Sequence, residues 1–279
     1  MCAASQIYIY EEGESTCMAM TKDIKKINAK SDDIGILTMY LNTDASEGQQ
    51  NGEWKIHLKN GMKELKDQVK ESENPKEGKA LKKLLDRMET RIQEQQLNMQ
   101  KSYFLAASAD GELWEEKILQ VPVTTSFHWS TEAQTQQLEA LDQKFPETGI
   151  IVIQQRNVAF IETALGEILD ERHFSWDLDR EDWVDYDKAT PPVDRATGKD
   201  AFQRRFDENR QRWYKNLVPR LSKEIKERKL SGAYLVGSRE SVAEVEPHMS
   251  ASYLKGTITK NLGPIPSHEI VKEVYDTLI

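Results

Sequence analysis

The stretch Gly149-Ile-Ile-Val-Ile-Gln154 decides the fold of this chain of 279 residues. Its uninterrupted apolar side chains are typical of a strand that is buried on both faces of a sheet. Two further strands are predicted directly after it, over residues 157–165 and 167–176, with Gly166 as the break between them. These three segments predict the first strands of a sheet-containing unit.

A long helix is predicted downstream, over residues 202–228. Its apolar residues recur at spacings of four and seven, so one face of the helix is expected to pack on the sheet. They are Phe202, Phe206, Trp213, Leu217, Leu221 and Ile225. Pro219 is expected to kink or divide this helix, because proline removes a hydrogen-bond donor and clashes with the preceding turn. Strands over 231–238 and 254–259 and a helix over 267–278 complete a mixed sheet with helices.

The residues before this unit predict a second α/β arrangement. A strand is expected over 34–42, two amphipathic helices over 54–69 and 81–92 with a break at 71–78, and a hairpin of strands over 102–108 and 112–121. A helix over 131–145, capped by Ser130 or Thr131, closes it. The chain is therefore predicted to be an α/β protein of two α/β domains, 31–146 and 147–279, after an N-terminal extension of residues 1–30. A loop is expected over 188–203.

Basic charge is concentrated in one segment of an acidic chain. Residues 195–230 hold twelve Lys or Arg against five Asp or Glu, whereas the whole chain has a formal net charge of −9. A basic stripe on an acidic body fits a phosphate-rich partner, because the stripe gains counterion release while the body discourages indiscriminate binding. Arg204, Arg205, Arg212 and Lys215 fall largely outside the apolar face of the predicted helix and stay available to RNA.

An acidic arm precedes the basic segment. Residues 167–187 contain nine acidic side chains and only Arg172 and Arg180 as basic ones. The simplest interpretation is a solvated and partly mobile loop, because acidic runs are usually solvating. The other hypothesis is that the arm shields the basic helix until RNA displaces it.

Several classes of protein are excluded by composition. Cys2 and Cys17 form neither a CxxC spacing nor a disulfide framework, so a reducing cytoplasm is expected. Neither an apolar run of membrane-spanning length nor a secretory signal is present, and a glycine-rich nucleotide loop is missing. We expect no cofactor, no metal and no intrinsic GTPase or ATPase activity.

Certain segments, in their order along the chain, resemble a known family. They are residues 149–154, Ala159-Phe160, Gly166-Glu167, the loop around Gly198, the helix start at 202–209, and residues 233–238. Together they look like the middle domain of the archaeal and eukaryotic class-one peptide-chain release factors, and more closely like the bacterial-archaeal release-factor-like proteins. Residues 36–42, the two helices after them and the hairpin over 103–121 resemble the N-terminal domain of that family. A C-terminal domain of the family is not expected after Ile279.

The resemblance implies a function on the ribosome. In the family, a Gly-Gly-Gln loop at the tip of the middle domain enters the peptidyl transferase centre and helps water attack the peptidyl-tRNA ester. Here Thr197-Gly198-Lys199 stands at that place, so one glycine is kept and lysine replaces glutamine. A lysine is a charged donor with no acceptor and cannot copy an amide. The nearest glutamine, Gln203, is interpreted as a surface residue of the first helical turn.

The family's codon-reading Asn-Ile-Lys-Ser string is also absent. At the corresponding tip between two helices the chain has Asn74-Pro-Lys-Glu-Gly-Lys79, whose simplest interpretation is a turn. The resemblance to a ribonuclease H-like middle domain raises one further alternative, a two-metal nuclease, which needs carboxylates converging on ions about 4 Å apart. Its candidate carboxylates are Asp177, Asp179, Glu181, Asp182, Asp185 and Asp187.

The functional expectation is a cytoplasmic translation factor that enters the ribosomal A site and points residues 197–203 at the peptidyl transferase centre. It either occupies idle ribosomes, in hibernation, silencing or quality control, or acts as a codon-independent peptidyl-tRNA hydrolase. The expected partners are large-subunit rRNA, P-site tRNA and a translational GTPase. The loop candidates are Thr197, Gly198, Lys199 and Gln203. The RNA-binding candidates are Arg195, Lys199, Arg204, Arg205, Arg212 and Lys215.

Overall fold

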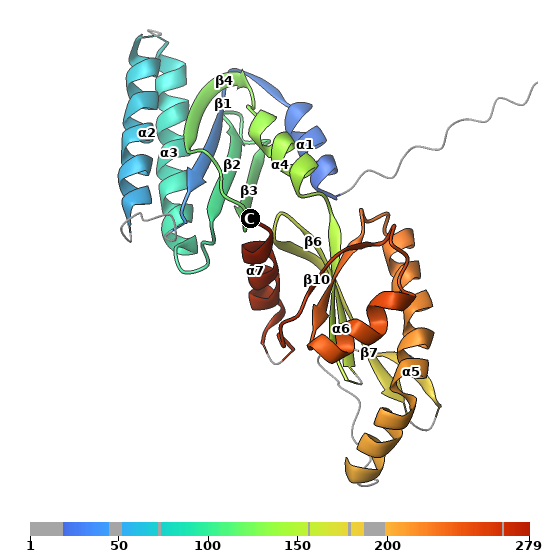
Figure 1. Cartoon of the computed structure of the whole chain (residues 1–279). Coiled ribbons are helices and arrows are strands. Elements are labelled where there is room, and N and C mark those ends of the chain that lie inside the picture. The colour runs from blue at the N-terminus through green and yellow to red at the C-terminus, as the bar shows by residue number, and fades with distance from the viewer. Residues whose placement is uncertain are drawn as a thin grey trace, which may run out of the picture.

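Two β-sheets with flanking helices form the framework of the protein, as the computed structural model shows (Figure 1). The structure describes residues 19–44, 52–71, 74–155, 157–177, 180–186, 199–263 and 265–279, and only the backbone at 19–21 and 199–207. The predicted α/β class with two sheets is confirmed. Whether the halves 31–146 and 147–279 fold as independent domains stays a prediction.

The first sheet has the strand order β3-β2-β1-β4, and each neighbouring pair is antiparallel. Its strands are β1 (Ser31–Asn42), β2 (Ser102–Ser108), β3 (Trp114–Leu119) and β4 (Ser126–Glu132). The predicted hairpin of β2 and β3 is confirmed. The long central strand β1 is paired on both sides, which explains why its residues from Gly35 to Leu41 are buried.

Helices cover both faces of this sheet because side chains alternate along a strand. Leu37 and Met39 pack with the buried sides of α2 (Glu53–Glu71) and α3 (Pro75–Gln95). Ile36 and Tyr40 share the opposite cluster with α1 (Ala19–Asn28) and α4 (Gln136–Lys144). Figure 1 shows the α2–α3 hairpin on one side of the strands and α1 with α4 on the other.

The second sheet is mixed, with the order β10-β9-β5-β6-β7-β8. Its strands are β5 (Thr148–Gln154), β6 (Asn157–Ala164), β7 (Glu167–Asp177), β8 (Asp182–Tyr186), β9 (Ala233–Gly237) and β10 (Leu254–Ile258). The β5–β9 and β9–β10 pairs are parallel, whereas β5 to β8 are joined as antiparallel neighbours. This mixed sheet agrees with the expectation from the sequence.

Strand β5 is buried on both faces, as the run Gly149–Gln154 predicts. Ile151 and Ile153 pack under α5 (Lys199–Glu227) and α6 (Arg239–Val245). Ile150 and Val152 face the other way, in one cluster with Ile270, Val271 and Val274 of α7 (Ser267–Leu278). Because that cluster also contains residues of α1 and β2, the cores of the two sheets are continuous.

Some elements differ from the sequence expectation. Residues 126–132 form strand β4, so the helix expected from Thr131 starts only at Gln136, after Thr135. The reason is pairing with the free edge of β1, which is about 90 residues away in sequence and invisible to local periodicity. Helices α1 and α6 and strand β8 were not anticipated either.

Helix α5 bears on two expectations. It is not divided at Pro219, and Leu217, Val218 and Leu221 are buried on both sides of the proline, whereas the kink expected there stays a prediction. It begins at Lys199, so residues 199–203 of the expected loop are helical.

Candidate nucleic-acid interface

Helix α5 is the element that positions the basic segment. Its 29 residues span about 43 Å, and its N-terminal turns extend past the strands at the end of the molecule opposite α2 and α3 (Figure 1). Trp213, Leu217, Leu221 and Ile225 are buried, so the predicted packing face is confirmed for the described side chains. The side chains of Phe202 and Phe206 lie outside the described part.

An aromatic cluster fixes α5 to the acidic hairpin of β7 and β8. The rings of Trp176 and Trp213 stack with centroids 4.3 Å apart, and Trp183 meets Trp176 edge to face at 5.7 Å. The indole nitrogen of Trp183 donates a 2.8 Å hydrogen bond to the carbonyl oxygen of Trp213. The three rings are at least 96% buried, so the hairpin and the helix share one core.

The acidic arm is therefore not a solvated loop within residues 167–177 and 182–186, which are the strands β7 and β8. Three aromatic residues, Phe174, Trp176 and Trp183, give the segment a buried side that its charge concealed. The arm does contact the basic helix: the guanidinium of Arg220 lies 2.6 Å from the carboxylate of Asp182. Within the described residues, this contact between the arm and α5 lies in the C-terminal half of the helix, away from Arg212 and Lys215.

Ion pairs also occupy the C-terminal arginine of this region. Arg228 contacts the carboxylates of Glu162, Asp170 (2.6 Å) and Glu224 (3.0 Å). Burial lowers the pKa of Arg228, but hydrogen bonds to these three carboxylates outweigh it and raise the pKa above its usual range. The Arg228 charge is thus committed to holding α5 on β6 and β7.

One arginine of the middle of α5 is committed to α6. The guanidinium of Arg210 lies 2.5 Å from Glu244 and 3.6 Å from Glu240. Its side chain is 29% exposed and the side chain of Glu244 is 15% exposed. Arg210 therefore attaches α6 to α5 and is a poor candidate for a partner contact.

Arg212 and Lys215 behave differently. Both side chains are exposed, on the opposite side of the helix from Trp213 and Leu217. Within the described part of the chain, neither of them forms an ion pair or hydrogen bond. Among the described basic side chains of α5, Arg210, Arg220 and Lys223 are thus paired with carboxylates, whereas Arg212, Lys215 and Lys226 are exposed and form no described ion pair.

The other predicted site residues cannot be placed in the same way. Arg195, Thr197 and Gly198 lie outside the described residues. Lys199, Gln203, Arg204 and Arg205 are in the first turns of α5, where the structure describes the backbone alone. Of this set, the structure therefore places only the backbone of Lys199, Gln203, Arg204 and Arg205, at the N-terminal end of α5.

The carboxylates of the nuclease alternative do not converge where they are described. Asp177 and Asp182 are opposite each other at the end of the β7–β8 hairpin, and each contacts an arginine, Arg180 at 3.6 Å and Arg220 at 2.6 Å. Asp179 and Asp187 lie outside the described residues. In the described ranges no three His, Cys, Asp or Glu side chains are grouped as metal ligands.

A second basic surface was not found from the sequence. Five exposed lysines of α2 recur at spacings of three and four, which places them along one side of the helix. They are Lys55, Lys59, Lys63, Lys66 and Lys70. Apart from Lys70, which lies 2.8 Å from Asp67, and Lys55, whose ammonium lies over the Trp54 ring, they contact no described acidic or aromatic group. The helical period of lysine alone would have revealed this lysine row.

Comparison with known proteins identifies the family. Residues 146–276 match the family described as Bacterial archaeo-eukaryotic release factor family 5. The chain is also 33% identical over 244 residues to Uncharacterized protein YocB of Bacillus subtilis (strain 168), an alignment that covers 86% of this chain and 91% of YocB. The chain belongs to this release-factor-like family, and membership supports a role in translation.

Solved structures are similar at lower identity. An archaeal translation termination factor, aRF1, is 13% identical, with 93% of this chain and 73% of that chain covered and a TM-score of 0.28. A second structure, titled Archaeal protein, is 12% identical, with coverage of 93% and 74% and a TM-score of 0.29. A search of the described helices found none that is both long and apolar enough to cross a membrane.

Proposed function

We propose that the protein binds the ribosomal A site and presents the N-terminal end of α5, with residues 197–203, to the peptidyl transferase centre. The observation that carries this proposal is the division of the α5 cations. Arg210, Arg220 and Lys223, and Arg228 just after the helix, are paired with carboxylates, whereas Arg212 and Lys215 are exposed and unpaired within the described chain and lie nearer the N-terminal end than Lys226, which is also unpaired. Unpaired cations on a projecting helix suit RNA phosphates, because phosphate contacts orient a protein without reading sequence.

The direction of α5 supports the same placement. The N-terminus of a helix carries partial positive charge and unsatisfied N–H groups, which favour anionic ligands. In this protein that end extends beyond the sheet, and the sequence there contains Lys199, Arg204 and Arg205. A ribosomal binding mode would bring this end to rRNA of the large subunit and to the end of a P-site tRNA.

The lysine row of α2 supports a second RNA contact. It lies at the opposite end of the molecule from the projecting turns of α5 (Figure 1). Cationic surfaces at both ends would let such a factor contact RNA phosphates at two separate places. A translational GTPase is a further candidate partner for delivery.

In the first form of the proposal the protein occupies idle ribosomes, in hibernation, silencing or quality control, without catalysis. Lys199 stands where the family has a glutamine, and an ammonium group cannot accept a hydrogen bond from a water nucleophile. The alternative is a codon-independent peptidyl-tRNA hydrolase. Family membership favours this alternative, because the release-factor fold places a loop at the peptidyl-tRNA ester.

Binding is tested first by co-sedimentation with purified ribosomes over a range of salt concentrations. The double variant Arg212→Ala/Lys215→Ala is expected to weaken binding about tenfold or more and to lower the salt slope by roughly 1.5, as two lost phosphate contacts would. The matched control is Lys223→Ala/Lys226→Ala, which removes the same charge from the other end of α5. Equal weakening by both variants would contradict the proposed contact face, and no binding by the unchanged protein would contradict the function.

Catalysis is tested by single-turnover release of labelled peptide from ribosome complexes with a stop codon, a sense codon or an empty A site. Binding without release supports the silencing form. Release of peptide from all three complexes supports the codon-independent hydrolase. The variant Lys199→Gln then shows whether an amide at this position accelerates peptide release.

A further inference from the structure

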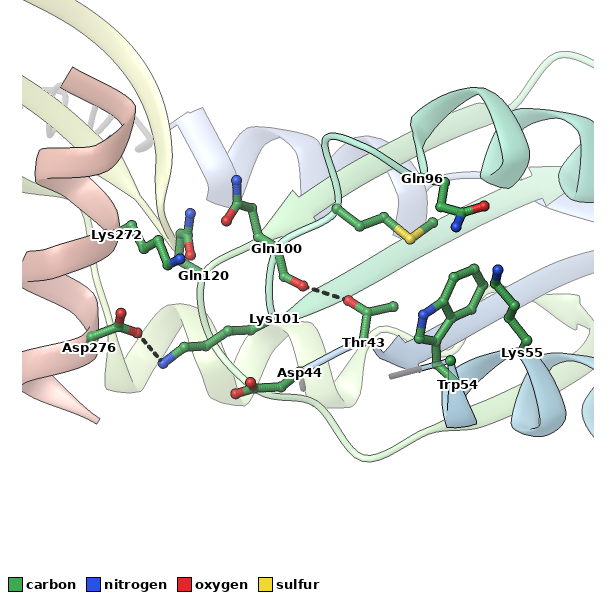
Figure 2. A pocket seen from close by; sticks show the side chains of 12 residues that line it. Thr43, Asp44, Trp54, Lys55, Gln96, Gln100, Lys101, Gln120, Lys272 and Asp276 are labelled. Carbon is green, nitrogen blue, oxygen red and sulfur yellow. Dashed lines mark hydrogen bonds and ion pairs between the residues drawn. The ribbon is translucent and has the colours of Figure 1, made fainter. Parts of the chain in front are cut away.

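A cavity of about 600 Å³ lies between the first sheet's helices and α7, remote from the basic end of α5 (Figure 2). Its walls come from the end of β1, the start of α2, the segment between α3 and β2, the end of β3, and α7. A volume of this size lies in the range of small-molecule sites, roughly 300–1,000 Å³, and such sites are frequent at the junction of two units. The cavity shares no residue with α5 and is independent of the proposed ribosomal function.

The two ends of the cavity differ in chemistry. At one end lies the half-buried indole of Trp54, and the ammonium of Lys55 lies over this ring, 5.4 Å from its centroid (Figure 2). At the other end lie Lys101 and Lys272 (Figure 2). An aromatic ring at one end and ammonium groups at both ends fit a ligand that has a planar ring and an anionic group.

The lysine end of the cavity has one cation that is not paired with a carboxylate. The ammonium of Lys101 lies 2.7 Å from the carboxylate of Asp276, so the two charges neutralise each other. Lys272, one helical turn before Asp276, is exposed and makes no ion pair with a described residue. An anion at this end of the cavity would therefore meet the uncompensated positive charge of Lys272, whereas Lys55, the other lining lysine without a described ion pair, lies at the Trp54 end.

The polar wall of the cavity contains a buried hydrogen-bond acceptor without a described donor. Gln120 is 4% exposed, lines the cavity, and its Oε1 accepts no hydrogen bond from any described residue. A buried carbonyl oxygen without a partner is unfavourable, so a ligand with a hydroxyl or amino donor at this place would be favoured.

We infer that this cavity binds a nucleoside phosphate, with the base on Trp54, the phosphate at Lys272 and a sugar hydroxyl or a base amino group donating to Gln120. Stacking of a base on an aromatic side chain is tolerant of base identity. Lys272 and Asp276 belong to α7, whereas Trp54 belongs to α2. The bound nucleotide therefore connects α7 to the helices of the first sheet.

The inference is tested with the full chain, free of ribosomes, by isothermal titration calorimetry and thermal unfolding. The probes are AMP, GMP, CMP and UMP, their triphosphates, and inorganic phosphate. At least one nucleotide is expected to bind with 1:1 stoichiometry and a Kd below about 1 mM, to raise Tm with concentration, and to bind more tightly than phosphate alone.

Variants assign the binding to the cavity. Lys272→Ala and Trp54→Ala are each expected to weaken nucleotide binding about tenfold, Gln120→Met to weaken it severalfold, and Trp54→Phe to retain most of it. The controls are Trp114→Phe, a tryptophan of β3 that faces α3, and Arg212→Ala/Lys215→Ala on α5, which should bind as the unchanged protein does.

Two results would overturn the inference. One is the absence of binding by all these nucleotides at about 5 mM, and the other is equal affinity in the Lys272→Ala, Trp54→Ala and unchanged proteins. Retained nucleotide binding by a protein that fails to sediment with ribosomes would refute only the proposed function.

Discussion

The backbone N–H of Gln120 donates a 2.8 Å hydrogen bond to the carbonyl oxygen of Leu165. This bond joins the end of β3 in the first sheet to the two-residue turn between β6 and β7 in the second. Leu165 and Gly166 have φ values of +51° and +92°, which suit a tight hairpin turn, and the Leu165 side chain is fully buried in the cluster that both sheets share. A strained leucine in this turn is held in place by its burial between the two units.

We predict that Gly166→Ala strongly destabilises the protein. A Cβ at this position would lie 2.1 Å from Cγ of Gln120, and the positive φ adds strain, so a loss of roughly 2–4 kcal/mol of unfolding free energy is expected. Gly111→Ala is the matched control, because its φ is +82° but nothing lies within 4 Å of its Cβ. Urea unfolding of both variants separates the cost of the overlap with Gln120 from the cost of the positive φ. Equal losses of unfolding free energy in the two variants would show that the Gln120 side chain moves aside without cost.

A second pair of glycines tests the packing of α2 on the first sheet. Alanine normally stabilises a helix interior by about 1 kcal/mol relative to glycine. Gly61→Ala is expected to do the reverse, with a loss of roughly 1–3 kcal/mol, because its Cβ would lie 2.1 Å from the ring of Phe127 on β4. Gly78→Ala in α3 meets only Val69 at 4.0 Å and is expected to be neutral or stabilising. Thermal unfolding measures both, and stabilisation by Gly61→Ala would refute the close approach of α2 and β4.

Lys117 provides a charged contact between the units. Its ammonium lies 2.7 Å from Asp23 and 3.2 Å from Glu167, and its side chain is 9% exposed. Burial lowers the pKa of Lys117, but the hydrogen bond to Asp23 and the charge of Glu167 outweigh it and raise the pKa. We predict that Lys117→Met lowers the unfolding free energy by about 1–3 kcal/mol, less than for a fully buried pair because both carboxylates can rehydrate.

The control for this prediction is Lys26→Met. Lys26 pairs with Glu115 on the same face of the first sheet, but its side chain is 66% exposed. Solvent screens such a pair, so no measurable change is expected in a chemical denaturation curve. A Lys117→Met protein as stable as the Lys26→Met protein would show that the bridge between α1 and β7 contributes nothing.

The elements that the sequence predicts well are those whose own residues determine them. Strand β2 was expected over the residues where it is found, and so was α7, because an unbroken apolar run and a helical period are local signals. Strand β4 was missed since its partner β1 comes from far upstream, and β8 was missed since acidic residues surround its one buried tryptophan, Trp183.

The sequence predicts which helix carries the candidate site, but it does not predict which of the basic residues are paired with carboxylates. The sequence separates the buried face of α5 from its basic face. It cannot separate Arg212, which is unpaired, from Arg220 and Arg228, because their partners come from β6, β7 and β8. The cavity at Gln120 was not predictable, since it depends on how α7 meets the first sheet.

Two buried tyrosines predict a loss of stability at alkaline pH. Burial raises the pKa of Tyr40 and of Tyr214 to about 12, and each hydroxyl donates a hydrogen bond to a backbone carbonyl, that of Gln134 at 2.8 Å and that of Gln155 at 3.0 Å. In the unfolded chain a tyrosine ionises near pH 10. The folded protein therefore keeps protons that the unfolded chain loses, so this stability is complete below about pH 10 and is lost as pH rises towards about 12.

Urea unfolding between pH 8 and pH 11.5 measures this slope, which can reach about 1.4 kcal/mol per pH unit for each tyrosine. Tyr40→Phe is expected to lower stability at neutral pH by about 1 kcal/mol, through the lost hydrogen bond, and to make the alkaline decline shallower. The control is Phe104→Leu, because the ring centroid of Phe104 lies 5.0 Å from that of Tyr40 and the substitution damages the same core without removing a titrating group. This control should lower the unfolding free energy by a similar amount at every pH. Parallel curves of unfolding free energy against pH for Tyr40→Phe and the unchanged protein would exclude Tyr40 as a source of the alkaline decline.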